Sequence, residues 1–545
     1  MVGRLARDSG TEVALHLDGR RVEPDPLVWA ADVDLTAPPL RTAAAWLPGF
    51  VRERLLDASA RRRHGVHHTP PAMAIGLVEL VGSVVPFDES TVVLDPAVGG
   101  GAFLLAVAER LPGERRQIVT RLRGVDLDPL AVATTRAALE LWSGGVGPDP
   151  GSLLVGDGLA ARPWSPQPTV VIGNPPFRAQ LRSSTARGRD DHGARRNRWP
   201  EVRRYVDEAA AFLLVGVEHV ADGGLVALVQ PASVFGALDA IALRDRLLES
   251  APPRAVWIDG EAQFGAAVDT VAVVLQKGGV AGPVRRAVGV PPEPVRSTPA
   301  PLPGTSWASL LRPGGAPVVG RERMSAAGTL GDVARVTAGL RSVLRPPPPS
   351  STIPRADTPH DVGPDRPARG ALGHGRLPVR SSSVASSSVR LDAVDPGVAS
   401  WFADRLVPKL LVASQTKVLE VVVDEAGEWL PCTPVVSVEP TEEAPSLWHV
   451  AAALTAPVVT AWLVDEAAGT ALSRDAVRVS AAVLCRVPLP GDRPAWDRAA
   501  EAARDRGMSD DRGSLLDVAR LALAAYGLPP DHPTLAWWQQ RLPRR

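Results

Sequence analysis

Residues 169–177, "TVVIGNPPF", place an apolar run directly before a stiff corner. β-Branched side chains favour a strand over the first part of this stretch. Proline has no N–H and fixes φ near about −65°, and each proline pushes the residue before it toward extended geometry. The stretch alone therefore leaves two interpretations open. It is either a simple turn or a rigid corner that presents an amide, two carbonyls and a ring to a ligand.

Short apolar runs alternate with helix-period segments on both sides of this corner, from about residue 70 to 277. Such alternation predicts an α/β fold with a doubly wound sheet, whose ligands bind at the carboxyl ends of the strands. The expected strands are 91–96, 122–128, 153–157, 169–174, 224–231, 255–260 and 269–277, and the expected helices are 71–82, 102–111, 129–142, 206–221 and 239–250. We expect the last two strands to form an antiparallel edge.

Composition narrows the class of protein. The 545 residues carry a formal net charge of +0, so no global field indicates a polyanionic partner. Cys432 and Cys485 are the only cysteines, which excludes a disulfide framework and a CxxC zinc site, and the ten histidines show no ligand spacing. We expect no metal. Neither a signal h-region nor a stretch of about 18 apolar residues is present, so we expect a cytoplasmic bacterial protein without a membrane span.

Three more polar strand ends precede the corner. "DPAVGGGAF" (95–103) supplies a glycine-rich turn, "GVDLDP" places Asp126 after a strand, and "GDG" places Asp157 after the next. Each has a plain structural reading, as a strand–helix turn, a helix N-cap (which Asp128 fits better) or a tight turn. Four such strand ends in this order are poorly explained by chance.

With these motifs the sequence resembles the γ-type N6-adenine-specific DNA methyltransferases, whose cofactor is S-adenosylmethionine. The resemblance implies a Rossmann-like methyltransferase sheet followed by a mixed α/β target-recognition domain. It implies cofactor binding by Thr69, Pro70, Asp95, Pro96, Gly99, Gly101, Phe103, Asp126 and Asp157, and catalysis by Asn174, Pro175, Pro176 and Phe177. His68 stands where the family has tyrosine in its Tyr-Thr-Pro element.

The chemistry of amino methylation explains why such a corner would be needed. An exocyclic amine is a poor nucleophile because its lone pair is delocalised into the ring. The Asn174 side-chain carbonyl and the Pro175 backbone carbonyl can accept its two hydrogens and so orient the lone pair toward the methyl group. Phe177 can stack on a base that has been flipped out of the duplex.

An arginine-rich stretch follows the corner directly. Residues 178–204 hold nine arginines against three acids, and Arg178, Arg182, Arg195, Arg196 and Arg198 are candidates for contacts with DNA phosphates. The alternative is a solvated disordered loop. The run Arg61–Arg63 is a weaker second candidate.

We expect four segments along the chain: a lead-in (1–60), the catalytic domain (61–285), a linker (286–397) and a target-recognition domain with a helical tail (398–545). Within the last, Lys409, Arg474 and Arg478 are guesses for backbone contacts with DNA. Residues 341–395 have no aromatic residue and read as a plain linker. The alternative is a partial frameshift, since a one-base shift can turn 342–346 into Gln-Tyr-Tyr-Gly-Leu.

The expected activity is site-specific methylation of adenine N6 in double-stranded DNA, in a restriction-modification or phage-defence setting. We expect a monomer, with any restriction nuclease encoded separately. Two alternatives stay open: another amino acceptor (N4-cytosine, RNA or a release-factor glutamine), or a DNA-binding subunit with impaired catalysis.

Overall fold

The computed structural model divides into two compact units, Met1–Leu310 and Leu311–Arg545, which are described separately. It describes residues 15–17, 20–22, 38–55, 69–160, 162–177, 198–202, 209–258, 269–290, 292–313, 315–319, 324, 326–339, 369–371, 386–388, 400, 403–431, 434–471, 475–507 and 511–542. Most of 341–395, as well as Arg61–Arg63, His68 and Arg474, lies outside these ranges, so the expectations for them stay predictions.

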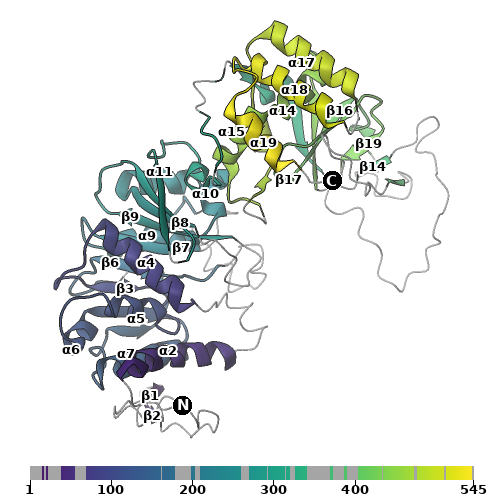
Figure 1. The fold of residues 1–545 in the computed structure, drawn as a ribbon. Coiled ribbons are helices and arrows are strands. Elements are labelled where there is room, and N and C mark those ends of the chain that lie inside the picture. The colour runs from purple at the N-terminus through teal and green to yellow at the C-terminus, as the bar shows by residue number, and fades with distance from the viewer. Residues whose placement is uncertain are drawn as a thin grey trace, which may run out of the picture. The chain divides into compact units, whose positions relative to one another are not determined.

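The first unit is built on a nine-stranded sheet with the order β11-β10-β8-β9-β7-β6-β3-β4-β5. Figure 1 labels β3, β6, β7, β8 and β9 of this sheet. All seven expected strands are confirmed: β3 (Val93–Asp95), β4 (Leu122–Asp126), β5 (Leu153–Val155), β6 (Val170–Gly173), β7 (Leu225–Pro231), β8 (Pro253–Ile258) and β9 (Thr270–Gln276). Strands β3 to β7 pair in parallel, so their carboxyl ends lie at one edge. The doubly wound fold predicted from the alternation is confirmed.

The predicted antiparallel edge is only partly right. Strand β9 does pair antiparallel with β8, but it also pairs antiparallel with β7 and therefore lies inside the sheet. Beyond β8 follow β10 (Val284–Val288), which is parallel to β8, and β11 (Glu293–Thr298), which is antiparallel to β10. Five of the six β11 residues are exposed, so this outer strand lacks the apolar alternation that predicts strands. Proline is tolerated at such an edge.

Helices cover both faces of the sheet. One buried cluster joins α4 (Pro71–Val84), α5 (Ala102–Ala108) and α7 (Pro129–Ser143) to the strand face that carries Val170 and Ile172. The intervening Val171 points to the opposite face, where α9 (Ala209–His219) approaches so closely that Gly216 has no room for a Cβ against Val226. The expected helices are confirmed, although α5 ends at Ala108 and α9 is described only from Ala209.

Helix α2 (Pro38–Leu55) belongs to the same face as α4, α5 and α7. Its Ala44 and Ala45 are part of the buried cluster, and Trp46 and Leu47 pack against it. The remaining elements of this unit are β1 (Leu15–Leu17), β2 (Arg20–Val22), α6 (Arg115–Ile118), η1 (Val119–Arg121), α10 (Ser233–Gly236), η3 (Leu238–Ala240), α11 (Ile241–Ser250) and, at its end, η4 (Ala308–Leu311).

The second unit is mixed α/β. Its main sheet is antiparallel, with the order β13-β20-β16-β18, formed by β13 (Ala334–Ala338), β20 (Val435–Pro440), β16 (Lys409–Ala413) and β18 (Val421–Asp424). The small strands are β12 (Ala326–Thr329), β14 (Arg369–Ala371), β15 (Ser386–Ser388), β17 (Gln415–Thr416), β19 (Trp429–Pro431), β21 (Val477–Arg478) and β22 (Pro488–Pro490). The helices are α12 (Leu330–Val333), α14 (Leu447–Thr455), α15 (Pro457–Ala467), α16 (Ala481–Cys485), α17 (Arg493–Arg506), α18 (Arg512–Ala525) and α19 (Pro533–Arg541).

Lys409 is not a DNA contact, contrary to the guess from sequence. Its side chain is 0% exposed, and its Nζ donates to Asp424 Oδ2 at 2.6 Å in an ion pair that is wholly inside the unit. The apolar neighbours in "LVPKLLVAS" gave the correct strand. The lysine faces the interior because a buried carboxylate compensates its charge.

No single helix among the described residues is long and apolar enough to cross a bilayer. Helices α14 and α15 satisfy that test only as a pair, which is bent by 67°.

Candidate active site

A cleft opens at the carboxyl edge of the first sheet, where the corner, the glycine-rich turn and helix α2 meet. It is lined by Trp46, Gly49, Arg52, Thr69, Asp95, Ala97, Val98, Gly99, Gly100, Ala102, Phe103, Leu105 and Asn174. The cleft thus brings together five of the residues expected from the sequence: Thr69, Asp95, Gly99, Phe103 and Asn174. The other expected residues are not among those that line the cleft.

Asp95 is buried beneath the corner. Its Oδ1 accepts from Ala97 N at 3.0 Å, which fixes the start of the glycine-rich turn. Burial raises the pKa of Asp95 to about 8, against the lowering effect of that hydrogen bond, and the neighbouring charge of Asp126 raises it further. A Cβ on Gly173 would lie 2.5 Å from Asp95 Oδ1. Asp95 therefore explains the glycine that precedes Asn174, and it braces the corner against the turn.

The glycine-rich turn is held by the carboxylate at the end of β4. Gly99 and Gly101 have φ values of 53° and 85°, a region that glycine enters without strain. Asp126 Oδ2 accepts from Gly99 N at 2.9 Å, and Asp126 Oδ1 accepts from Asp128 N at 2.9 Å. Each carboxylate oxygen can accept more than one hydrogen bond, so Asp126 can still receive a hydroxyl donor.

Burial raises the pKa of Asp126, while the two backbone N–H donors and the charge of Arg52 oppose the rise. Asp128 fulfils the capping role expected from the sequence, since its side chain accepts from Leu130 N at the start of α7.

The Asp157 turn packs directly against the glycine-rich turn. Asp157 Oδ1 accepts from Leu159 N at 2.9 Å, and a Cβ on Gly158 would collide with the carbonyl oxygen of Pro96. The glycine after Asp157 is therefore required by contact between two strand ends. This contact holds the Asp157 turn against Pro96, whose neighbours Asp95 and Ala97 line the cleft.

In the corner, the side-chain amide of Asn174 is only partly hydrogen-bonded. Asn174 Nδ2 donates to Thr69 Oγ1 at 3.2 Å, which joins the corner to the upstream Thr-Pro element. Asn174 Oδ1 is buried and has no hydrogen-bond partner within the described ranges. Pro175 is buried, and the half-buried Phe177 packs against the core cluster. A buried acceptor without a donor calls for an explanation, and a ligand N–H supplies one.

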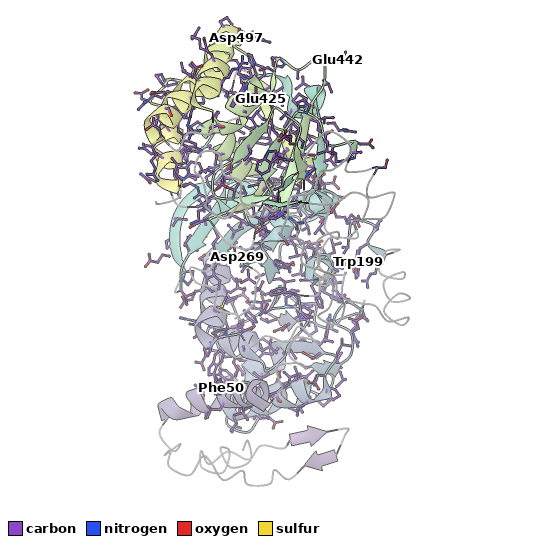
Figure 2. The ribbon with its side chains drawn as sticks, turned by 90° about the vertical axis from the view of Figure 1, so that its right-hand side faces the viewer. Phe50, Trp199, Asp269, Glu425, Glu442 and Asp497 are labelled. Atoms are coloured by element: carbon purple, nitrogen blue, oxygen red, sulfur yellow. The ribbon has the colours of Figure 1, made fainter. Side chains whose placement is uncertain are left out.

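Of the five arginines expected to contact DNA, only Arg198 is described; Arg178, Arg182, Arg195 and Arg196 lie outside the described residues. Arg198 donates to the Leu159 carbonyl at 2.7 Å, pairs with Glu218 on α9, and lies 4.2 Å over the ring of Trp199. Trp199, labelled in Figure 2, is itself buried and donates to Glu218 at 2.9 Å. Arg198 is therefore held against the Asp157 turn and α9.

Sequence reasoning missed the part of the cleft that comes from α2. Trp46, Gly49 and Arg52 precede every recognised motif, and a proline and a glycine inside a helix gave no cofactor signal. Among the described residues, no group of three or more His, Cys, Asp or Glu side chains is placed to hold a metal ion.

The fold and the cleft together define a Rossmann-like α/β methyltransferase. Residues 50–277 match the family model described as N-6 DNA Methylase. The chain thus carries an adenine DNA methyltransferase domain, and its cofactor is S-adenosylmethionine. No curated protein sequence matches the chain.

Several solved structures are similar to the chain. The Type IIL restriction-modification enzyme MmeI, in complex with DNA, is 13% identical with a TM-score of 0.60, covering 93% of this chain and 82% of that one. The type IIG restriction endonuclease BpuSI is 13% identical over 93% of this chain and 72% of its own, with a TM-score of 0.43. A type I methyltransferase subunit from Streptococcus thermophilus is 21% identical over 48% and 53%, with a TM-score of 0.35. The similarity to MmeI shows a shared fold.

The cleft residues fit S-adenosylmethionine. Gly99 leaves the backbone bare for a close approach, and the Thr69 hydroxyl lines the cleft. The Asp126 carboxylate, which accepts from Gly99 N, offers a further polar group beside it. Asn174, whose buried Oδ1 has no partner among the described residues, lines the same cleft.

Proposed function

We propose that the chain is a site-specific DNA methyltransferase that modifies the N6 amine of a flipped adenine in a restriction-modification or phage-defence setting. The observation that carries this proposal is the buried Oδ1 of Asn174, which has no partner in the described part of the chain. It lies on the cofactor cleft and is held there by Thr69.

The roles at the corner follow from the chemistry of the amine. Asn174 Oδ1 accepts one N6 hydrogen, and the Pro175 carbonyl accepts the other. Pro176 keeps the corner rigid and offers no competing N–H. Phe177 stacks on the base. With both hydrogens held, the nitrogen lone pair points at the reacting carbon, so the residues act by position and electrostatics. S-adenosylmethionine, when bound, supplies the electrophilic methyl group.

The cofactor roles are assigned to the neighbouring strand ends. Gly99 and Gly101 shape the turn, with Pro96 and Phe103 fixing its two sides, and Asp126 accepts from the ribose hydroxyls. Asp157 accepts from the adenine amine of the cofactor. Thr69, after which Pro70 starts α4, positions Asn174 and remains near the methionine carboxylate. Asp95 acts from beneath as a brace, because its carboxyl is buried.

Double-stranded DNA is the proposed partner. The arginine-rich residues 178–204 are placed by sequence directly after the catalytic corner, and MmeI, whose fold is similar, is described in complex with DNA. We assign target recognition to residues 398–545, after a linker region within 286–397. A nuclease encoded separately and a monomeric methyltransferase complete the proposal.

The decisive experiment is incubation of the purified chain with labelled S-adenosylmethionine and genomic DNA from a methylation-free host. N6-methyladenine at one recurring sequence is the expected result. N4-methylcytosine, or transfer to RNA or protein alone that Asn174→Ala abolishes, would establish another acceptor. DNA binding without any transfer would establish a subunit with impaired catalysis.

A further inference from the structure

Helix α2 supplies one side of the cofactor cleft, although it precedes every sequence motif. Trp46, Gly49 and Arg52 are spaced three residues apart, so they share one helix face, and all three line the cleft. Phe50, one residue after Gly49, is 42% exposed and lies on α2 in Figure 2. The cleft-facing side of α2 is therefore distinct from its exposed side.

The contact between α2 and the glycine-rich turn is made backbone to backbone. A Cβ on Gly100 would lie 2.6 Å from Gly49 Cα, and a Cβ on Gly49 would lie 3.0 Å from the Gly100 carbonyl oxygen. Unlike Gly99 and Gly101, Gly100 does not have a positive φ. Conformation therefore does not explain the middle glycine of the motif, whereas the approach of α2 does.

Arg52 connects α2 to the carboxylates at the end of β4. Its side chain is 8% exposed and pairs with Asp128. Asp128 caps α7 and donates its N–H to Asp126, which in turn accepts from Gly99 N. Arg52 Nε is buried on this cleft without a partner among the described residues. The Arg52 guanidinium is thus paired with Asp128, next to the Asp126 carboxylate that holds the glycine-rich turn.

We propose that α2 is a wall of the S-adenosylmethionine cleft and that Arg52 is a positioning residue, which holds Asp126 and Gly99 in their binding geometry. Trp46 adds apolar surface beside it. The ligand class rests on the proposed function, but the positioning of Gly99 by Arg52 is a property of the free chain.

The test measures S-adenosylhomocysteine binding to the full chain by calorimetry, together with hydrogen exchange of the Gly99 amide in the free protein. Arg52→Gln is expected to weaken binding about tenfold and to accelerate Gly99 exchange, while Arg52→Lys, which keeps the charge, falls between it and wild type. Arg110→Gln is the matched control, because Arg110 pairs with Glu79 on the same unit with side chains 48% and 42% exposed. It should leave both measurements unchanged.

Wild-type affinity and wild-type Gly99 exchange in Arg52→Gln would overturn the inference. If that variant does not fold, Arg52→Lys decides, and wild-type values for it count against the positioning role. A folded wild-type chain that binds no S-adenosylhomocysteine would instead refute the proposed function, and the exchange of Gly99 would still show whether Arg52 positions the turn.

Discussion

Two buried polar sites, one in each unit, differ in whether their hydrogen bonds are complete. In the second unit Lys409 and Asp424 are both buried, and Asp424 also accepts from Glu428 N and Trp429 N at 3.0 and 2.9 Å. In the first unit Asn174 donates to Thr69, but its buried oxygen has no partner within the described ranges. Burial of a polar group costs free energy unless its hydrogen bonds are made. The Lys409–Asp424 site is complete within the protein, whereas under the proposed function the substrate amine completes the hydrogen bonds of Asn174.

Asn174→Ala tests the incomplete site and should have the largest effect. Loss of one acceptor for the amine is expected to lower the methylation rate about 100- to 1,000-fold, by the measure of a lost transition-state hydrogen bond. Single-turnover methylation of DNA checks this, with S-adenosylhomocysteine affinity and the melting temperature expected near wild type. A large loss of melting temperature together with an unchanged methylation rate would show instead that Asn174 has a structural role.

Asp424→Ala tests the complete site. Removal of one partner leaves the Lys409 charge buried and alone, which should cost about 3 kcal/mol of unfolding free energy. Denaturant unfolding followed by a signal from the second unit measures the loss. Replacing both partners, as in Lys409→Met with Asp424→Leu, should recover much of it, because no lone charge remains. Equal losses in the single and double variants would contradict this account.

Asp95→Asn tests the buried carboxyl of Asp95, which contacts both the corner and the glycine-rich turn. The folded pKa of Asp95 is about 8, above its unfolded value, so between about pH 4 and pH 8 the folded state keeps a proton that the unfolded state releases. Stability should therefore fall as pH rises through this window, by up to about 1.4 kcal/mol per pH unit from this one group. The Asp95→Asn variant, whose side chain is neutral throughout this window, should lose that slope.

Asp88→Asn is the control for the pH measurement, because hydrogen bonds from the Ser90 and Thr91 hydroxyls lower the pKa of Asp88 below the window. Its unfolding free energy should keep the wild-type slope between pH 4 and pH 8. A wild-type slope in Asp95→Asn as well would show that Asp95 is ionised in the folded chain.

Glu218→Gln should have the smallest effect. The pair of Arg198 and Glu218 is partly exposed, so its loss should change the unfolding free energy by less than about 1 kcal/mol. DNA affinity, measured by anisotropy over a salt series, should show a salt dependence at least as steep as wild type, because Arg198 is released from its protein partner. A shallower salt dependence would contradict the anchoring role.

The sequence predicted those parts of the site whose signal is local. Short apolar runs located the seven strands. Glycine, carboxylate and proline residues located the four strand ends around Asp95, Asp126, Asp157 and Asn174. The missed parts depend on partners distant in sequence. Lys409 has the sequence signal of a surface lysine, and only the fold shows that Asp424 lies beside it. The pairing of Arg198 with Glu218 likewise has no local signal in the sequence. Gly49 has no local signal, because only the fold brings it to Gly100.

The close approach of Gly49 to Gly100 also affects where a recombinant catalytic fragment should begin. A recombinant catalytic fragment starting at residue 61, the limit suggested by the motifs, would lack α2 altogether. The apolar surface now covered by Ala44, Ala45 and Leu47 would face water, and such a patch promotes aggregation. A fragment that begins before Pro38 keeps α2 over this apolar surface. It is therefore the better fragment in which to measure cofactor binding.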